Sequence, residues 1–224
     1  MIQQSVPQDS LVRSYLTLRK AVGIIGCALP FVLALGKMLT QSSGIQGSIS
    51  CYYYTDMRDV FVGSLCAIGI FLMSTRGYDW RDELFGILAC VFAIGVAFFP
   101  TTPCTDPAPR FHLVGFLHLA FAAALFLTLA FFSIFLFTET DPHKIPTRQK
   151  IQRNRVYLAC GWIIIGCIFV MAAVELTPLK GYVEWLSPVF WLESTAIISF
   201  GVSWLTKGEA ILKDDEAPSL SSAP

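Results

Sequence analysis

Six polar or aromatic side chains stand at the ends of long apolar segments or interrupt them, and these residues could bind a ligand or transfer protons. They are Tyr54, Arg58, Asp59, His112, His118 and Glu193. His118 and Glu193 fall within apolar segments, where an ionisable group is costly to bury unless it finds a partner. Such groups therefore mark functional sites, and the six residues together predict a polar ligand pocket.

His118 and Glu193 are expected to lie at similar depths. His118 is seven residues into its segment and Glu193 is eight residues into its own, which corresponds to about 10 Å and about 12 Å of helix. Both segments are expected to enter from the same membrane face. The two side chains are therefore predicted to meet, with Arg58 or Asp59 above them. Such a pair could bind a metal, transfer a proton or form a buried hydrogen bond between helices.

Asp56 and Asp59 are a second candidate constellation, with Arg58 between them. The spacing suits a carboxylate pair, but it is also typical of a helix start with one capping acid and another acid in the first turn. Helix capping is the favoured interpretation. Arg58 could bind an anionic head group bidentately, or form a salt bridge with Asp59 or Glu175.

A metal site would have to combine His112, His118, Glu193 and Asp59. The two histidines are six residues apart, which places them about 120° apart around one helix. Zinc takes three or four protein ligands, and the third histidine, His143, is expected on the opposite side of the membrane. The sequence therefore predicts no metal or other cofactor, and zinc remains the alternative.

The segments that must position these residues are predicted to be transmembrane helices. Of the 224 residues, 54% are hydrophobic and 14% are charged, whereas soluble domains carry about 25% charged residues. Six apolar runs are long enough to cross a bilayer: 21–39, 57–74, 84–100, 111–137, 156–174 and 185–205. They lack the alternating polarity of a membrane β-barrel. The predicted fold class is all-α, a polytopic membrane bundle of six transmembrane helices, with one domain over 1–213 and a disordered acidic tail at 214–224.

The distribution of Lys and Arg predicts the orientation of the bundle. The N-terminus, the 75–83 and 138–155 loops and the C-terminal tail hold twelve of the 16 basic residues, and the opposite loops hold four. Because basic residues favour the cytoplasmic side, both termini are expected in the cytoplasm, in a multi-pass protein of the bacterial inner membrane. Membrane lipids are the expected partners. The formal net charge of zero gives no indication of nucleic-acid binding.

The first apolar run also resembles a secretory signal, because basic residues precede it and Ala34-Leu35-Gly36 could be a cleavage site. The length of the run and of the segment before it favours an uncleaved helix.

Cys51 and Cys104 are the two cysteines outside the predicted helices. Both are expected in loops on the outer, oxidising side, so they are the candidate disulfide. The other five are interpreted as small packing residues. Six helix glycines are predicted to mark close helix contacts, namely Gly23, Gly26, Gly63, Gly69, Gly161 and Gly166.

Three stretches of this chain resemble uncharacterised bacterial six-helix inner-membrane proteins of the domain-of-unknown-function type. The stretches are SISCYYYTDMRDVFVGSLCAIGIFLMSTRGYD, FHLVGFLHLAFAAALF and FWLESTAIISFGVSWLTKG. This resemblance would cover most of the chain and implies a six-helix fold, but no activity.

A weaker resemblance is to the membrane hydrolases of the ceramidase and progestin-receptor superfamily, which use Ser, Asp and three His around zinc in seven helices. Ser50 and Asp59 could stand for the Ser and Asp, and His118 for one His. The late paired-histidine motif is absent and Glu193 occurs instead, so no catalytic role is carried over.

The expected function is that of an integral membrane protein with an outward-facing polar pocket for a lipid or small amphiphile. A metal-dependent hydrolase acting on lipids is the alternative, and a small transporter or channel is the third possibility. The sequence predicts no particular reaction.

Overall fold

The chain folds as a bundle of helices. The computed structural model describes residues 8–41, 44–74, 80–103, 112–140 and 146–212, and within these ranges every regular element is helical. The long helices are α1 (Gln8–Gln41), α2 (Arg58–Ser74), α3 (Trp80–Phe98), α4 (His112–Phe131), α5 (Arg148–Leu176) and α7 (Pro188–Lys207). The short elements are the 3-10 turns η1 (Ser50–Tyr54) and η4 (Glu184–Leu186), the π-helical segment η3 (Phe132–Leu136) and α6 (Leu179–Val183).

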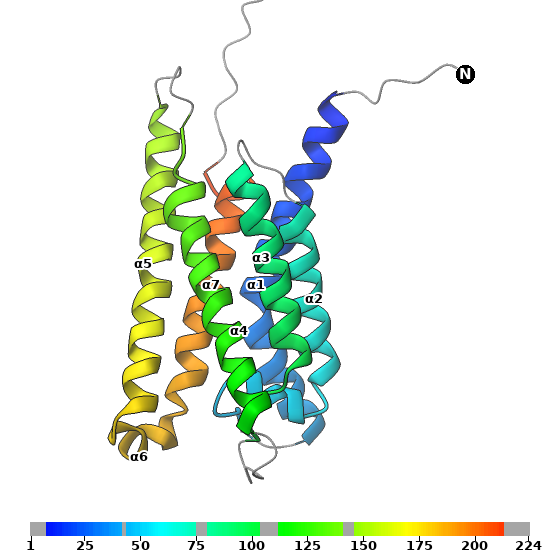
Figure 1. Cartoon of the computed structure of the whole chain (residues 1–224). Helices are drawn as coiled ribbons and strands as arrows, with labels where there is room; N and C mark the ends of the chain where they lie inside the picture. Colours follow the sequence, from blue (N-terminus) through cyan, green and yellow to red (C-terminus); the bar gives the residue numbers. More distant parts are fainter. Residues whose placement is uncertain (1–7, 42–43, 75–79, 104–111, 141–145, 213–224) are drawn as a thin grey trace, which may run out of the picture.

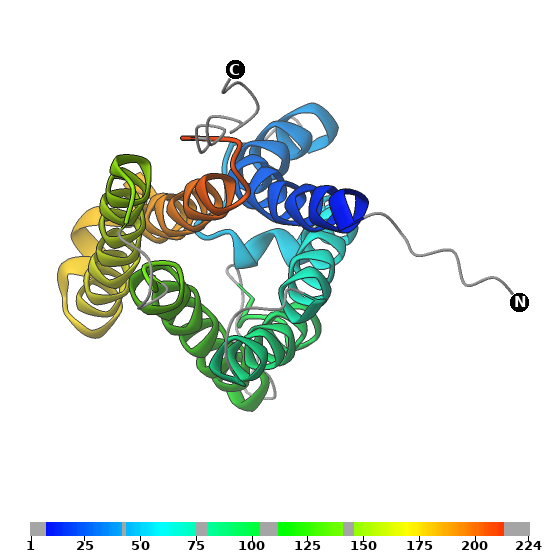
Figure 2. The same cartoon turned by 90° about the horizontal axis from the view of Figure 1, so that it is seen from above.

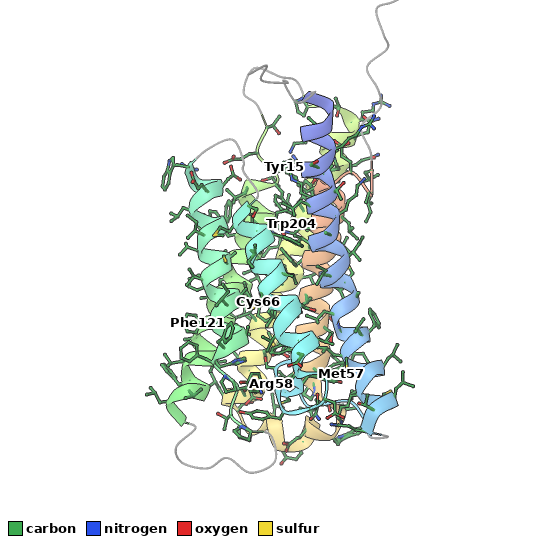
Figure 3. All side chains as sticks on the ribbon, turned by 90° about the vertical axis from the view of Figure 1, so that its right-hand side faces the viewer. Tyr15, Met57, Arg58, Cys66, Phe121 and Trp204 are labelled. Atoms are coloured by element: carbon green, nitrogen blue, oxygen red, sulfur yellow. The ribbon has the colours of Figure 1, made fainter. Side chains whose placement is uncertain are left out.

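The six long helices run side by side and close into a ring (Figures 1 and 2). In the order α1, α2, α3, α4, α5 and α7, each helix packs against the next, and α7 returns to α1. Arg58 and Met57 lie toward one end of the bundle, whereas Tyr15 and Trp204 lie toward the other (Figure 3). These ends are called the Arg58 end and the Trp204 end below.

Within the described ranges, four helices are long and apolar enough to cross a membrane. They are the ones over Val12–Gln41, Leu113–Leu136, Arg148–Leu176 and Pro188–Lys207. The two other long helices are less suited to crossing by length and composition. α2 has 17 residues, and α3 has 19 but carries charged residues in its first turn.

The helices extend beyond the apolar runs from which they were predicted. α1 begins at Gln8 instead of residue 21, and α5 begins at Arg148 instead of residue 156. Both extensions are polar, so a search for apolar residues misses them. The side chain of Thr147 caps α5 by accepting a hydrogen bond from the Lys150 amide at 3.1 Å. In α1, Arg19 lies over the ring of Tyr15 four residues earlier, at 4.1 Å from its centroid.

Small residues bring the helix axes together at two of the packed faces. Between α2 and α3, a methyl group on Gly69 would lie 3.3 Å from the Cα of Cys90, and one on Gly86 would lie 2.9 Å from the Leu72 carbonyl oxygen. Between α1 and α7, Gly23 and Gly201 face each other with backbone nearly in contact. In a lipid environment the hydrophobic effect does not drive helices together. Small residues that let the backbones approach closely are therefore typical of contacts between membrane helices.

Candidate functional site

The loop between α1 and α2 turns inward at the Arg58 end. Its 3-10 turn η1 is buried at Ser50, Cys51 and Tyr52. Two bonds pin the start of the loop: Lys37 Nζ donates to the Gly44 carbonyl at 2.5 Å, and the Phe190 amide donates to the Gly47 carbonyl at 3.0 Å. The loop therefore lies across the end of the helix ring.

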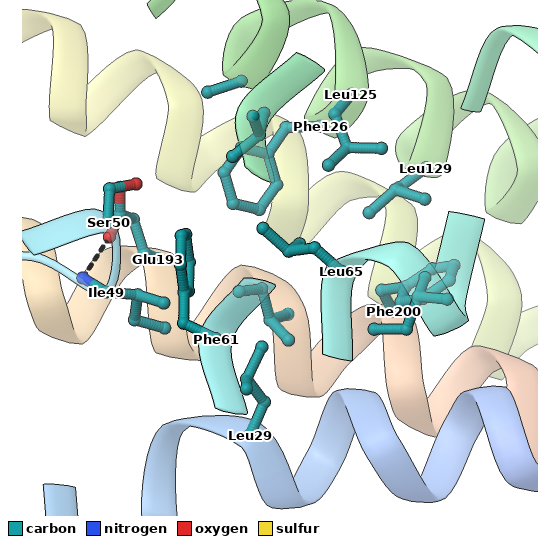
Figure 4. Close-up of a pocket in the computed structure, with 14 residues that line it drawn as sticks. Leu29, Ile49, Ser50, Phe61, Leu65, Leu125, Phe126, Leu129, Glu193 and Phe200 are labelled. Carbon is teal, nitrogen blue, oxygen red and sulfur yellow. Dashed lines mark hydrogen bonds between the residues drawn. The ribbon is translucent and has the colours of Figure 1, made fainter. Parts of the chain in front are cut away.

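Glu193 of α7 holds this loop from inside the bundle. The Ile49 amide, at the start of η1, donates a hydrogen bond of 2.6 Å to Glu193 Oε2 (Figure 4). The Ser50 backbone also lies close enough to interact favourably with the carboxylate. A 3-10 turn leaves its first amides without partners within the turn, so the carboxylate serves as a cap supplied by another helix.

A cavity of about 40 Å³ lies beside this carboxylate within the ring. A single water needs about 10–15 Å³ on this measure, so the space is narrow. Glu193 and Ser50 are its polar lining residues. The rest of the lining is apolar and comes from Ile49, just before η1, and from α1, α2, α3, α4 and α7. These helices contribute Leu29, Phe61, Leu65, Ile68, Val96, Ala122, Leu125, Phe126, Leu129, Ile197 and Phe200.

The predicted pairing of His118 with Glu193 is wrong. His118 is buried, but its Nδ1 is hydrogen-bonded to the Phe99 carbonyl at the end of α3, at 2.6 Å. Among the described residues, neither side chain hydrogen-bonds to the other. The depths estimated from the sequence gave no information on helix rotation. His118 therefore links α4 to the residue that follows α3, whereas Glu193 links α7 to the loop between α1 and α2.

Tyr54, Arg58 and Asp59 are not among the residues that line the cavity. Partial burial raises the pKa of Tyr54, whose hydroxyl therefore stays protonated and donates to the Thr101 carbonyl at 2.5 Å. Arg58 is exposed, donates to Tyr53 Oη at 2.7 Å and stacks over that ring at 4.4 Å. Asp59 is exposed in the first turn of α2.

His112 begins α4, and its side chain lies outside what the structure describes. An outward-facing pocket built from the six predicted residues is therefore not what the described residues form. Glu193 is the one predicted pocket residue that lines the cavity.

The cap at the start of α2 also differs from the prediction. Thr55 Oγ1, and not the Asp56 carboxylate, accepts the hydrogen bond from the Met57 amide, at 3.2 Å. Thr55 also donates through the same hydroxyl to the Tyr52 carbonyl at 2.8 Å. This threonine thus links the end of η1 to the start of α2, whereas Asp59 occupies the first turn as expected.

The metal alternative is not supported by the side-chain positions. Within the described ranges, no three His, Cys, Asp or Glu side chains come together as a metal site. His118 and Glu193 have separate backbone partners, and Asp59 is exposed.

Cys51 forms a disulfide bond, and the five cysteines of the long helices are free. Cys104 lies outside the described residues, so the Cys51–Cys104 pair stays a prediction. Ser48 Oγ accepts a hydrogen bond from the Cys51 amide at 3.1 Å, which fixes the backbone next to the disulfide.

Sequence reasoning missed Ile49 and the apolar residues of the cavity wall. Ile49 acts through its backbone amide, which carries no sequence signal. The wall residues, such as Phe61, Ala122 and Leu125, look like ordinary packing residues until the ring of helices brings them around one space.

Comparisons of the chain with protein-family models, curated proteins and solved structures find no match.

Proposed function

We propose that the protein is a six-span integral membrane protein that binds a small amphiphile inside the helix ring. The observation that carries the proposal is the narrow apolar cavity with the Glu193 carboxylate at its wall. Apolar pockets with one or a few well-placed polar groups are typical ligand sites.

The arrangement of the helices supports six spans. α2 packs against α1 and α3 packs against α4, and α1 and α4 are two of the four helices that are long and apolar enough to cross a membrane (Figure 1). At 1.5 Å per residue, 17 and 19 residues extend about 26 Å and about 29 Å. These lengths nearly match a hydrocarbon core of about 30 Å. If both termini are cytoplasmic, as the distribution of basic residues predicts, the Arg58 end faces outward and the Trp204 end faces the cytoplasm.

The chemistry of the lining indicates the class of ligand. A carboxylate accepts hydrogen bonds through two oxygens with about four acceptor positions, and the Ile49 amide and the Ser50 backbone use part of them. A ligand head group next to Glu193 should therefore be a donor, such as an amine or a hydroxyl, and an anionic head group would be repelled. The narrow apolar space suits a segment of one hydrocarbon chain.

Decylamine and decanol should stabilise the purified protein, and decanoate should not. At about 100 times the dissociation constant, the expected rise in the unfolding temperature is about 5 °C or more. Thermal unfolding in detergent micelles with each compound measures this. Ala122→Phe should remove the rise because Ala122 lines the cavity.

The matched control is Ala159→Phe, which adds the same group at an exposed position of α5 and should leave the rise intact. Equal responses of the two variants to decylamine, or equal stabilisation by decanoate, would contradict the proposal.

Reporter fusions should place both the 138–155 loop and the C-terminus in the cytoplasm. The physical reason is the bias of twelve basic residues against four. Alkaline phosphatase fused after Lys213 should be inactive and green fluorescent protein at the same place should fluoresce. The opposite result would reverse the orientation, and a mixed result would rule out a single topology.

A further inference from the structure

Four cations converge at the Trp204 end, where α1, α5 and α7 meet. Lys207 interacts electrostatically with Arg19, Lys150 and Arg153, and with the Asp82 carboxylate. Arg19 Nη1 also lies 3.4 Å from the Lys207 carbonyl oxygen, to which it donates. Arg19, Lys150, Arg153 and Lys207 are called the basic cluster below.

The basic cluster rests on aromatic rings. Lys207 Nζ lies 5.2 Å from the centroid of Phe137, and Lys150 Nζ lies 6.0 Å from that of Tyr157. Lys150 also donates to the Phe137 carbonyl at 2.9 Å. The Phe137 ring packs edge-on against both Tyr157 and Trp204. The rings keep water from one side of the ammonium groups, which strengthens their attraction for an anion.

Two buried donors at this end lack a hydrogen-bond partner within the described residues. Trp204 is 1% exposed, and its indole Nε1 donates to nothing. Arg19 uses its two terminal nitrogens on Lys207 and Tyr15, and its buried Nε has no partner. Buried N–H groups without acceptors are rare because burial removes their hydrogen bonds to water without replacing them. Both donors suit an acceptor that the chain itself does not supply among the described residues.

We propose that the basic cluster of Arg19, Lys150, Arg153 and Lys207 binds a phosphate group that carries net negative charge. A phosphate combines several acceptor oxygens, which the Arg19 Nε and Trp204 Nε1 donors lack, with a negative charge that suits ammonium and guanidinium groups. Lys150 and Arg153 lie in the first turns of α5 and Lys207 in the last turn of α7. In the proposed six-span arrangement, on which this step rests, helix ends lie at the depth where lipid phosphates meet the hydrocarbon. The phosphate source is a lipid head group or a soluble phosphate, and the test separates the two. The site is independent of the cavity near Glu193, which lies toward the other end of α7.

Native mass spectrometry of the full-length protein from micelles tests the proposal with three probes. These are dioleoylphosphatidic acid, dioleoylphosphatidylcholine as the zwitterionic comparison, and inorganic phosphate. The unmodified protein should retain phosphatidic acid at least about tenfold more tightly than phosphatidylcholine. Lys207→Gln and Arg19→Gln should each weaken retention of phosphatidic acid about tenfold, because each variant removes a charged hydrogen-bond donor from the site.

The matched controls are Arg13→Gln and Arg155→Gln, which remove the same charge at exposed positions of α1 and α5 and should retain the lipid normally. Competition by millimolar inorganic phosphate would support a soluble phosphate as the ligand, and its failure to compete would support the lipid. Equal retention of the two lipids by the unmodified protein, together with no binding of phosphate, would overturn the proposal without any variant. Equal losses in the cluster variants and the exposed controls would overturn it as well.

Discussion

Replacing Gly201 with valine should separate α1 from α7 and destabilise the bundle by about 3 kcal/mol or more. A methyl group on Gly201 would lie 2.8 Å from the Cys27 amide nitrogen and 2.8 Å from the Gly23 carbonyl oxygen. Both are backbone atoms, so no side-chain rotation can relieve the contact. The helices would have to move apart, which would also weaken the contact of Cys27 Sγ with the Ile198 carbonyl at 3.7 Å.

Thermal unfolding and the monodisperse fraction in size-exclusion chromatography measure the effect of Gly201→Val. The matched control is Gly166→Val in α5, where an added Cβ meets nothing within 4 Å. This control should change stability by about 0.5 kcal/mol or less. Similar losses of stability in both variants would show that the effect of Gly201→Val does not come from α1–α7 packing.

The sequence did not distinguish glycines at close helix contacts from glycines that face open space. Gly23, Gly26, Gly69 and Gly161 were predicted at close helix contacts, and each has a neighbour within about 3.5 Å of an added methyl group. Gly63 and Gly166 were predicted the same way, and both face open space. A helix glycine indicates that close packing is allowed, but the rotation of the helix decides whether a neighbour is there.

The long helices could be predicted because a helix that crosses a bilayer needs about 20 mostly apolar residues, and this requirement does not depend on which helices it packs against. Their polar extensions could not be predicted, because those residues are stabilised by local pairs such as Arg19 with Tyr15 and by capping at Thr147. The short elements η1, α6 and η4 were missed as well. Turns of three to five residues carry too little periodicity to be recognised.

Of the residues that form the candidate site, the sequence predicted Glu193. Glu193 stood out because a carboxylate in an apolar segment needs a partner, and the structure supplies one. The partner is the Ile49 amide rather than His118. Every non-proline residue has such an amide, so nothing in the sequence selects Ile49. The choice depends on how η1 folds back into the ring, which is a tertiary property.

Glu193→Leu should have a large effect because it removes the acceptor for the Ile49 amide at 2.6 Å. An unsatisfied buried donor costs about 1–3 kcal/mol, and hydrogen bonds to charged groups lie at the upper end of this range. We expect a loss of about 3 kcal/mol in unfolding free energy. Hydrogen exchange of the amides from Ile49 to Tyr52 should become faster, because η1 loses the bond that holds it inside the bundle.

Glu193→Gln distinguishes the structural role of this residue from its proposed binding role. The amide oxygen of glutamine can still accept from Ile49, so exchange in η1 should stay slow and the loss should be about 1 kcal/mol. Binding of decylamine should nevertheless weaken about tenfold or more, because the charge that attracts the ammonium is gone. Glu184→Leu is the matched control for the leucine variant, since Glu184 is exposed in η4, and it should leave both exchange and binding unchanged. If Glu193→Gln bound decylamine as well as the unmodified protein while η1 stayed protected, Glu193 would be a structural cap alone and the ligand would have to be held by the apolar wall.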